Sequence, residues 1–324
     1  MRNRFWNFNH KLNSNLKSAN VIRNLPVKAC GDRAQQGRLE YMKEFKEILM
    51  KIACMAAACI SIIAVALICI FLFANGLPAI GKIGAFSFLF GDTWLPSKDL
   101  YGIFPMIIGS IYVTAGAIIV GVPTGILCAI YLARFCPKGL YHILKPAIDL
   151  LAGIPSIVYG FFGLVVIVPL MQDLFGGSGK SILTASILLG IMILPTIISV
   201  TESSIRAVPE SYYEGALALG ATHERSVFYA MLPAAKSGIL AGVVLGIGRA
   251  VGETMAVVMV AKNSAAIPSS ILDGVRTLTA NIVLEMGYAT DLHREALIAT
   301  GVVLFIFILI INLSFSLLKR KEQK

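Results

Sequence analysis

Six long apolar stretches, separated by shorter polar segments, dominate the pattern of this chain. An α-helix rises about 1.5 Å per residue, so about 20 apolar residues cross the roughly 30 Å hydrocarbon core of a membrane. Five of the six stretches contain no Asp, Glu, Lys or Arg. The pattern predicts an all-α, polytopic membrane protein whose six transmembrane helices cover approximately residues 52 to 74, 105 to 133, 150 to 172, 181 to 201, 237 to 261 and 296 to 318.

The composition agrees with this class. Hydrophobic residues make up 57% of the 324 residues and charged residues only 14%, which excludes a soluble domain. We find no catalytic nucleophile beside a plausible base, the six cysteines show no C-x2-C pairing, and the four histidines are scattered. We therefore expect neither a catalytic centre nor a metal site in this chain.

The 28 Lys and Arg residues are distributed unequally between alternate loops. Residues 1 to 51, 134 to 146, 202 to 236 and the tail after 318 contain 21 of them, whereas the other loops contain only six. Positive residues concentrate on the cytoplasmic side of membrane proteins. Both termini and the 202 to 236 loop are therefore predicted to be cytoplasmic, and the formal net charge of +10 reflects topology rather than nucleic-acid binding.

The polar loop from 202 to 236 has the local signals of a short helix-turn-helix. Pro209 suits the start of a helix, Gly220 suits a left-handed end, and Thr222 suits the cap of a second helix that runs toward Pro233. Periodicity alone favours an amphipathic linker that lies against its own bundle. A knob that fits a groove in a partner is the alternative, because the loop combines a charged rim with apolar surface from Tyr212, Tyr213, Leu217, Leu219, Val227 and Phe228.

The same loop resembles the sequence E-A-A-x3-G-x9-I-x-L-P, which marks the membrane subunits of ATP-binding-cassette (ABC) importers. The matching positions are Glu214, Ala216, Gly220, Leu232 and Pro233. Gly215 and Ala230 depart from the pattern, at its first alanine and its isoleucine. The resemblance favours the docking interpretation and implies that these five residues couple the chain to an ATPase.

Charge enters the predicted spans only at Arg249 and Glu253, in the sequence GRAVGET. Residues four apart share one face of a helix, and charge near the middle of a membrane costs a few kcal/mol even on lenient scales. A structural ion pair and a substrate path that offers a guanidinium to an oxyanion both explain the pair. Close helix packing is predicted on the same span by two glycine ladders, Gly238-Gly242-Gly246 and Gly248-Gly252.

From about Met42 to its C-terminus, the chain resembles the PstC family, one of the two permease subunits of bacterial phosphate ABC importers. The resemblance rests on the docking loop and on FGDTWLP, YGIFPMIIGS, AGIPSIVYGFFG and GIGRAVGETMAV, which begin at residues 90, 101, 152 and 246. It implies a type I importer permease fold in the bacterial plasma membrane, and a role for Arg249 and Glu253 in phosphate passage. A carboxylate at position 253 could accept a hydrogen bond from protonated phosphate and repel sulfate.

The resemblance also implies partners: a PstA-type second permease, two copies of a PstB-type ATPase and an extracytoplasmic PstS-type phosphate-binding protein. ATP and Mg²⁺ would be bound by the ATPase, and no cofactor by this chain. The alternatives are the sister permease PstA or a permease for molybdate or sulfate. A secondary transporter or channel is a further alternative, but it would leave the polar 202 to 236 loop without a purpose.

Residues 1 to 41 differ from the rest of the chain. Residues 1 to 38 contain eight basic residues and one acidic residue, Asp32, with no apolar run that could form the core of a signal peptide. We expect disorder there. Met42 opens MKEFKEILMK, which resembles the start of such permeases, so a misassigned start or a dispensable extension is our hypothesis for the first 41 residues.

Overall fold

The computed structural model describes residues 27–322, with side chains described over residues 46–314. The chain divides into two compact units, Met1–Cys69 and Ile70–Lys324. The disorder expected for residues 1 to 26 lies outside the described residues, but residues 27 to 41 form the first part of a helix, in contrast to the expectation. That helix is α2 (Val27–Ile83).

Six described helical segments are long and apolar enough to span a membrane, which confirms the predicted number. Their bounds are Lys46–Ile83, Phe104–Phe135, Ser156–Phe175, Ile182–Arg206, His223–Gly252 and Asp291–Ser314. The third and fifth spans show how the bounds differ from the prediction. Pro155 separates the third span from a preceding amphipathic helix, and the fifth span begins 14 residues earlier and ends before Glu253.

Short helices and π-helical turns connect and interrupt these spans. After α2 come α3 (Ala85–Phe90), the antiparallel strands β1 (Trp94–Leu95) and β2 (Leu100–Tyr101), and the 3-10 turn η1 (Pro96–Lys98) between them. The next elements are α4 (Phe104–Ile130), η2 (Tyr131–Phe135), α5 (Lys138–Gly153), α6 (Ser156–Phe162), η3 (Gly163–Ile167) and α7 (Val168–Phe175). The remaining elements are α8 (Ile182–Arg206), α9 (Glu210–Ala218), α10 (His223–Ser226), η4 (Val227–Met231), α11 (Leu232–Gly252), α12 (Met255–Val260), α13 (Leu278–Glu285) and α14 (Asp291–Glu322).

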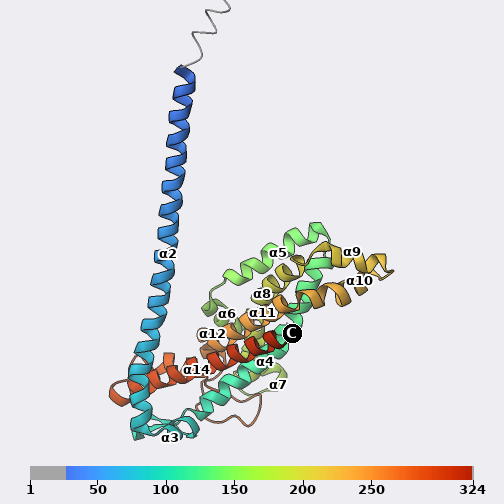
Figure 1. The fold of residues 1–324 in the computed structure, drawn as a ribbon. Helices are drawn as coiled ribbons and strands as arrows, with labels where there is room; N and C mark the ends of the chain where they lie inside the picture. The colour runs from blue at the N-terminus through green and yellow to red at the C-terminus, as the bar shows by residue number, and fades with distance from the viewer. Residues whose placement is uncertain (1–26, 323–324) are drawn as a thin grey trace, which may run out of the picture. The chain divides into compact units, whose positions relative to one another are not determined.

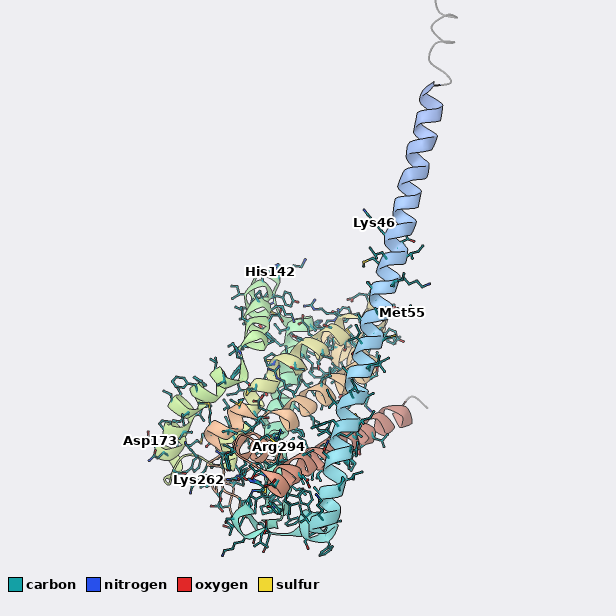
Figure 2. All side chains as sticks on the ribbon, turned by 90° about the vertical axis from the view of Figure 1, so that its left-hand side faces the viewer. Lys46, Met55, His142, Asp173, Lys262 and Arg294 are labelled. Atoms are coloured by element: carbon teal, nitrogen blue, oxygen red, sulfur yellow. The ribbon has the colours of Figure 1, made fainter. Side chains whose placement is uncertain are left out.

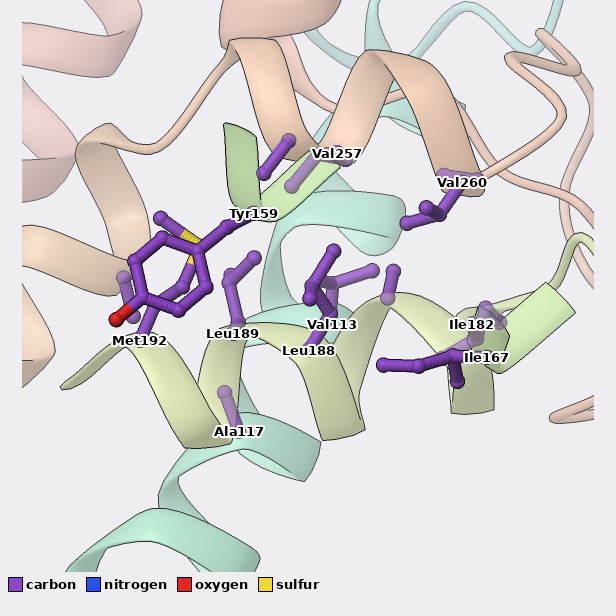
Figure 3. Packing of buried hydrophobic residues seen from close by; sticks show 14 of the residues in the cluster. Val113, Ala117, Tyr159, Ile167, Ile182, Leu188, Leu189, Met192, Val257 and Val260 are labelled. Atoms are coloured by element: carbon purple, nitrogen blue, oxygen red, sulfur yellow. The ribbon is translucent and has the colours of Figure 1, made fainter. Parts of the chain in front are cut away.

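Helix α8 forms the centre of the larger unit and packs against α4 and α11 (Figure 1). Its first turn is capped by Ser181, whose hydroxyl accepts a hydrogen bond from the Thr184 backbone N–H. Leu188, Leu189 and Met192 of α8 are almost fully buried, and side chains from α4, α6 and α12 close over them (Figure 3). This apolar layer fixes α8 as the element against which the other helices are positioned.

Loops from the two predicted sides of the membrane lie at opposite ends of the larger unit. Figure 2 shows His142 at one end and Asp173, Lys262 and Arg294 at the other. His142 belongs to a loop predicted to be cytoplasmic, whereas Lys262 and Arg294 belong to the loops predicted to be external. The fold therefore separates the two groups of loops as a bundle across a membrane requires.

The first glycine ladder lies at a close helix contact, as predicted. A Cβ atom on Gly238 would lie 2.2 Å from the Ser204 Oγ atom and 2.4 Å from its Cβ, and one on Gly246 would lie 2.7 Å from the Ile197 side chain. The second ladder differs, because a Cβ atom on Gly248 or Gly252 would meet nothing within 4 Å. Only the ladder that begins at Gly238 brings α11 and α8 together.

The strands β1 and β2 are held to α13 and α14 by a buried carboxylate. Glu285 Oε2 accepts a hydrogen bond of 2.8 Å from the Trp94 indole and lies 2.9 Å from His293 Nε2, while Oε1 accepts one of 2.6 Å from Arg276. Burial alone would raise the pKa of Glu285, but these three partners outweigh it and hold the pKa below its usual range. The Glu285 carboxylate thus stabilises this end of the fold in its ionised form.

Substitution of Gly238 by alanine is expected to destabilise the protein, since the new methyl group clashes with Ser204, whose Cβ no rotamer change can move. We expect overpacking to cost about 1–3 kcal/mol. The control is Gly248→Ala, which gains the same helix propensity in open space. Thermal unfolding of the purified protein in detergent measures the difference, and equal midpoints for the two variants would refute the close packing.

The Glu285 cluster predicts a pH dependence of stability. Because its pKa is lowered on folding, its contribution is complete above the unfolded value of about 4.3 and is lost as the pH falls through the folded value. We expect Glu285→Gln to lower the unfolding temperature by several degrees at pH 7 and by less at pH 3. Thermal unfolding between these pH values is the test, and a constant difference would contradict the assignment.

Candidate functional site

The predicted fifth span is broken at Glu253. Helix α11 ends at Gly252, Glu253 has extended backbone angles (φ −70°, ψ 133°), and α12 begins only at Met255. The expectation that Arg249 and Glu253 share one face of a continuous helix is therefore wrong. Gly252 favours the end of α11 at this position, because glycine is among the weakest helix formers.

Arg249 finds its partner on a different helix. Its guanidinium donates a hydrogen bond of 3.2 Å to the hydroxyl oxygen of Thr196 on α8, and both side chains are half-buried. No ion pair joins Arg249 to Glu253 among residues 46–314, so the structural ion-pair interpretation does not hold in this conformation. A guanidinium has five donors, and Thr196 uses one of them.

Glu253 organises the break itself. Its Oε1 atom accepts a hydrogen bond of 3.2 Å from the Ala256 backbone N–H, in the first turn of α12. Its backbone carbonyl accepts one of 3.0 Å from the Thr279 hydroxyl on α13. Backbone groups freed at a helix break inside a membrane must find partners in the protein. Glu253 therefore caps α12 and ties the break to α13.

Helix α13 is in turn held against α4. The Leu278 backbone N–H donates a hydrogen bond of 2.9 Å to the Ser110 hydroxyl, and Thr277 caps the helix by accepting from the Ala280 N–H. A Cβ atom on Gly109 would lie 2.6 Å from the Arg276 carbonyl oxygen, so the two backbones approach closely there. The break at Glu253 is supported by a rigid set of contacts rather than by a loose loop.

The docking loop has the local structure that its sequence predicted. Pro209 is the N-cap of α9, Gly220 adopts a positive φ of 83° directly after its end, and Thr222 caps α10 by accepting from the Arg225 N–H. The second helix differs from the expectation, because it continues through η4 into α11 instead of ending near Pro233. The part of the loop that is separate from the spans is therefore α9 with its following turn, residues 210–222.

The five motif residues lie in two places. Glu214, Ala216 and Gly220 belong to α9 and the turn after it, whereas Leu232 and Pro233 form the first turn of α11. Ala216 and Gly220 line a surface hollow of about 450 Å³ together with Leu219, Ala221, Arg225, Tyr229 and Ala230. Leu219 is 91% exposed and Tyr229 80% exposed, so this end of the bundle presents unburied apolar side chains.

Two polar groups that sequence analysis missed lie behind this surface. Arg134 in η2 donates to both carboxylate oxygens of Glu210, at the first residue of α9. Glu202, in the last turn of α8, is only 2% exposed and binds Tyr141, Lys145 and Arg206. The only signal in the sequence is the four-residue spacing of Glu202 and Arg206, because the partners on α5 lie about 60 positions away. Among the described residues, no group of three His, Cys, Asp or Glu side chains could hold a metal ion.

Comparison with known proteins agrees with these features. The family model described as "Binding-protein-dependent transport system inner membrane component" matches residues 121–324. The chain is 39% identical to the probable ABC transporter permease protein YqgH of Bacillus subtilis, over 83% of this chain and 91% of that protein. It is 36% identical to the phosphate transport system permease protein PstC of Mesorhizobium japonicum, over 79% and 84% of the two chains. It is 32% identical to PstC of Haemophilus influenzae, over 89% and 98%.

Solved structures show the same fold at low identity. A chain of a bacterial ABC transporter involved in the import of alginate has a TM-score of 0.53 and 16% identity, over 82% of this chain and 96% of that chain. A chain of the inward-facing MetNI methionine ABC transporter has a TM-score of 0.52 and 20% identity, over 72% and 100%. These likenesses confirm the type I importer permease fold. The chain belongs to the family of binding-protein-dependent transport system inner membrane components, the multi-pass, non-enzymatic permease subunits of ABC importers.

Proposed function

We propose that this chain is the PstC-type permease subunit of an ATP-driven importer that moves inorganic phosphate into the cytoplasm. The observation that carries the proposal is the half-buried Arg249 beside a helix break in the fifth span, in a chain related to PstC permeases over most of its length. A charged residue within a membrane span is expensive and marks a substrate path by default.

The chemistry of Arg249 suits a phosphate anion. A guanidinium presents donors in a planar fork that matches phosphate oxygens, and it remains charged at any physiological pH. Its one hydrogen bond among the described residues, to Thr196, leaves donors for an anion. Because one arginine binds an anion without enclosing it, release remains rapid, as transport requires.

Membership of the importer family implies two kinds of partner, an ATPase and a substrate-binding protein. The specific partners that we propose are a PstA-type second permease, two copies of a PstB-type ATPase that bind ATP and Mg²⁺, and an extracytoplasmic PstS-type phosphate-binding protein. The unequal distribution of Lys and Arg supports an orientation with both termini and residues 202–236 in the cytoplasm. In this orientation α9 faces the ATPase, and Glu214, Ala216, Gly220, Leu232 and Pro233 contribute to the coupling.

Other functions are less well supported. A secondary transporter or channel has no need of the exposed helix α9, and the family assignment disfavours it. The sister permease PstA and permeases for molybdate or sulfate share the docking loop. The relatives named PstC, at 32% and 36% identity over at least 79% of this chain, favour phosphate over these alternatives.

The Arg249→Gln variant tests the proposed path. We expect radiolabelled phosphate uptake in cells with the complete importer to fall at least about tenfold, since the loss of a charged hydrogen-bond donor costs about 1.5–3 kcal/mol. The matched control is Arg294→Gln, which removes an equal charge from the exposed first turn of α14. Membrane levels and assembly of each variant are compared first. Normal uptake by an assembled Arg249→Gln importer would remove Arg249 from the path.

The Glu253→Gln variant separates the charge of Glu253 from its cap. Glutamine keeps the oxygen that accepts the Ala256 N–H but carries no charge to repel sulfate. We expect the purified importer to retain phosphate binding and to lose its discrimination against competing sulfate severalfold. Glu253→Ala, which also loses the cap, is expected to be less stable by about 1 kcal/mol. Unchanged discrimination in Glu253→Gln would leave Glu253 with a structural role only.

A further inference from the structure

The buried carboxylate of Glu202 joins α5 to the end of α8. Its Oε1 atom accepts hydrogen bonds of 2.7 Å from the Tyr141 hydroxyl on α5 and 2.8 Å from Arg206 Nε on α8. Lys145 Nζ on α5 lies 3.3 Å from its Oε2 atom. The hydrogen bond to Glu202 raises the pKa of Tyr141, so its hydroxyl remains a donor. Tyr141 and Lys145 of α5 are thus both held to the end of α8 by this buried carboxylate.

Arg206 extends the connection to the end of α4. Its Nη2 atom donates a hydrogen bond of 2.8 Å to the Leu132 carbonyl in η2, and its guanidinium lies 4.6 Å from the centre of the Tyr141 ring. The wide π-helical turn η2 is a form that occurs frequently at functional sites in helices. Glu202 and Arg206 therefore hold α5, α8 and η2 together at one end of the bundle.

Helix α9 is attached to the same group of residues. Only residues 207–209 separate α8 from α9, and Val208 in this linker is buried with Ile205. Arg134 of η2 binds both oxygens of Glu210 at the start of α9. The η2 turn accepts a hydrogen bond from Arg206 at the Leu132 carbonyl, and its own Arg134 binds Glu210 of α9. It therefore links Glu202 and Arg206 to α9 through side chains, in addition to the backbone connection.

We infer that Glu202 is a positioning residue that couples α9 to the membrane helices, so that α9, η2, α5 and the end of α8 move as one body. The inference rests on the proposed function, in which an ATPase displaces α9. A buried carboxylate that bridges two helices through directional contacts fixes their relative geometry. Packed elements joined in this way shift as rigid units, which transmits a displacement instead of absorbing it.

Glutamine at position 202 weakens the connection with little change in volume. The substitution removes the negative charge that holds Lys145 and Arg206, and it turns an amide N–H2 group toward one of these cations. Removal of one partner from a buried ion pair is strongly destabilising, because the remaining charge is left uncompensated. The matched control is Asp149→Asn, which also removes a carboxylate partner of Lys145. Asp149 has a 53% exposed side chain, and its hydrogen bond from the Ser199 hydroxyl of α8 is 3.5 Å long, so it contributes less to the connection than buried Glu202 does.

The experiment measures phosphate transported per ATP hydrolysed in proteoliposomes that contain the complete importer. We expect Glu202→Gln to hydrolyse ATP within about twofold of the wild-type rate but to transport at least about fivefold less phosphate per ATP. Asp149→Asn is expected to keep the wild-type ratio. An equal ratio for Glu202→Gln and wild type overturns the inference, and so does a parallel fall in both activities, which indicates a purely structural role.

A second variant keeps the inference testable where Glu202→Gln fails to assemble with the ATPase. Tyr141→Phe removes only the hydroxyl that binds Glu202, and a ratio reduced at least about twofold supports the inference, whereas a wild-type ratio contradicts it. Failure of the proposed function gives a different result. A wild-type importer that transports another anion and not phosphate overturns the proposed substrate, and the ratio for each variant is then measured with that anion.

Discussion

The arrangement around Arg249 depends on one constraint: backbone groups within a membrane must be satisfied inside the protein. The chain leaves regular helix at Glu253, where the protein itself supplies partners for backbone groups of the break. The Glu253 carboxylate caps α12, and the Glu253 backbone carbonyl accepts a hydrogen bond from the Thr279 hydroxyl of α13. Helix α13 is held in place by Ser110 of α4. The break leaves the Arg249 guanidinium half-buried beside α8 instead of paired within its own helix.

The buried charges of the larger unit are subject to the same constraint, since they too must find partners inside the protein. Glu285 at one end and Glu202 at the other are buried, and each is neutralised by an arginine and a second basic side chain from a different element. Such groups contribute little net stability, since desolvation offsets most of the attraction, but they tolerate few alternative geometries. Arg249 differs because its described contact is a neutral hydroxyl. In the proposed importer, it is the charge that takes an anion as its partner.

Sequence analysis predicted the features that depend on neighbouring residues in the chain. Span number follows from length and hydrophobicity, and the caps at Pro209, Gly220 and Thr222 follow from the conformational preferences of single residues. The break at Glu253 was missed because Thr279 lies 26 positions later, and no local pattern announces that contact. Glu202 was missed for the same reason: it looked like the first polar residue of a loop, and its partners on α5 are joined to it only by the tertiary fold.

Helix α8 connects the two ends of the proposed mechanism. It carries Thr196, the partner of Arg249, and Glu202, the centre of the group that holds α9. These positions are six residues apart, about 9 Å along the axis. Most of α8 is buried and packed through Gly238, Gly242 and Gly246 of α11, so it has little room to bend independently. In the proposed importer, a displacement of α9 therefore reaches the surroundings of Arg249 through one rigid helix, without a longer chain of side-chain contacts.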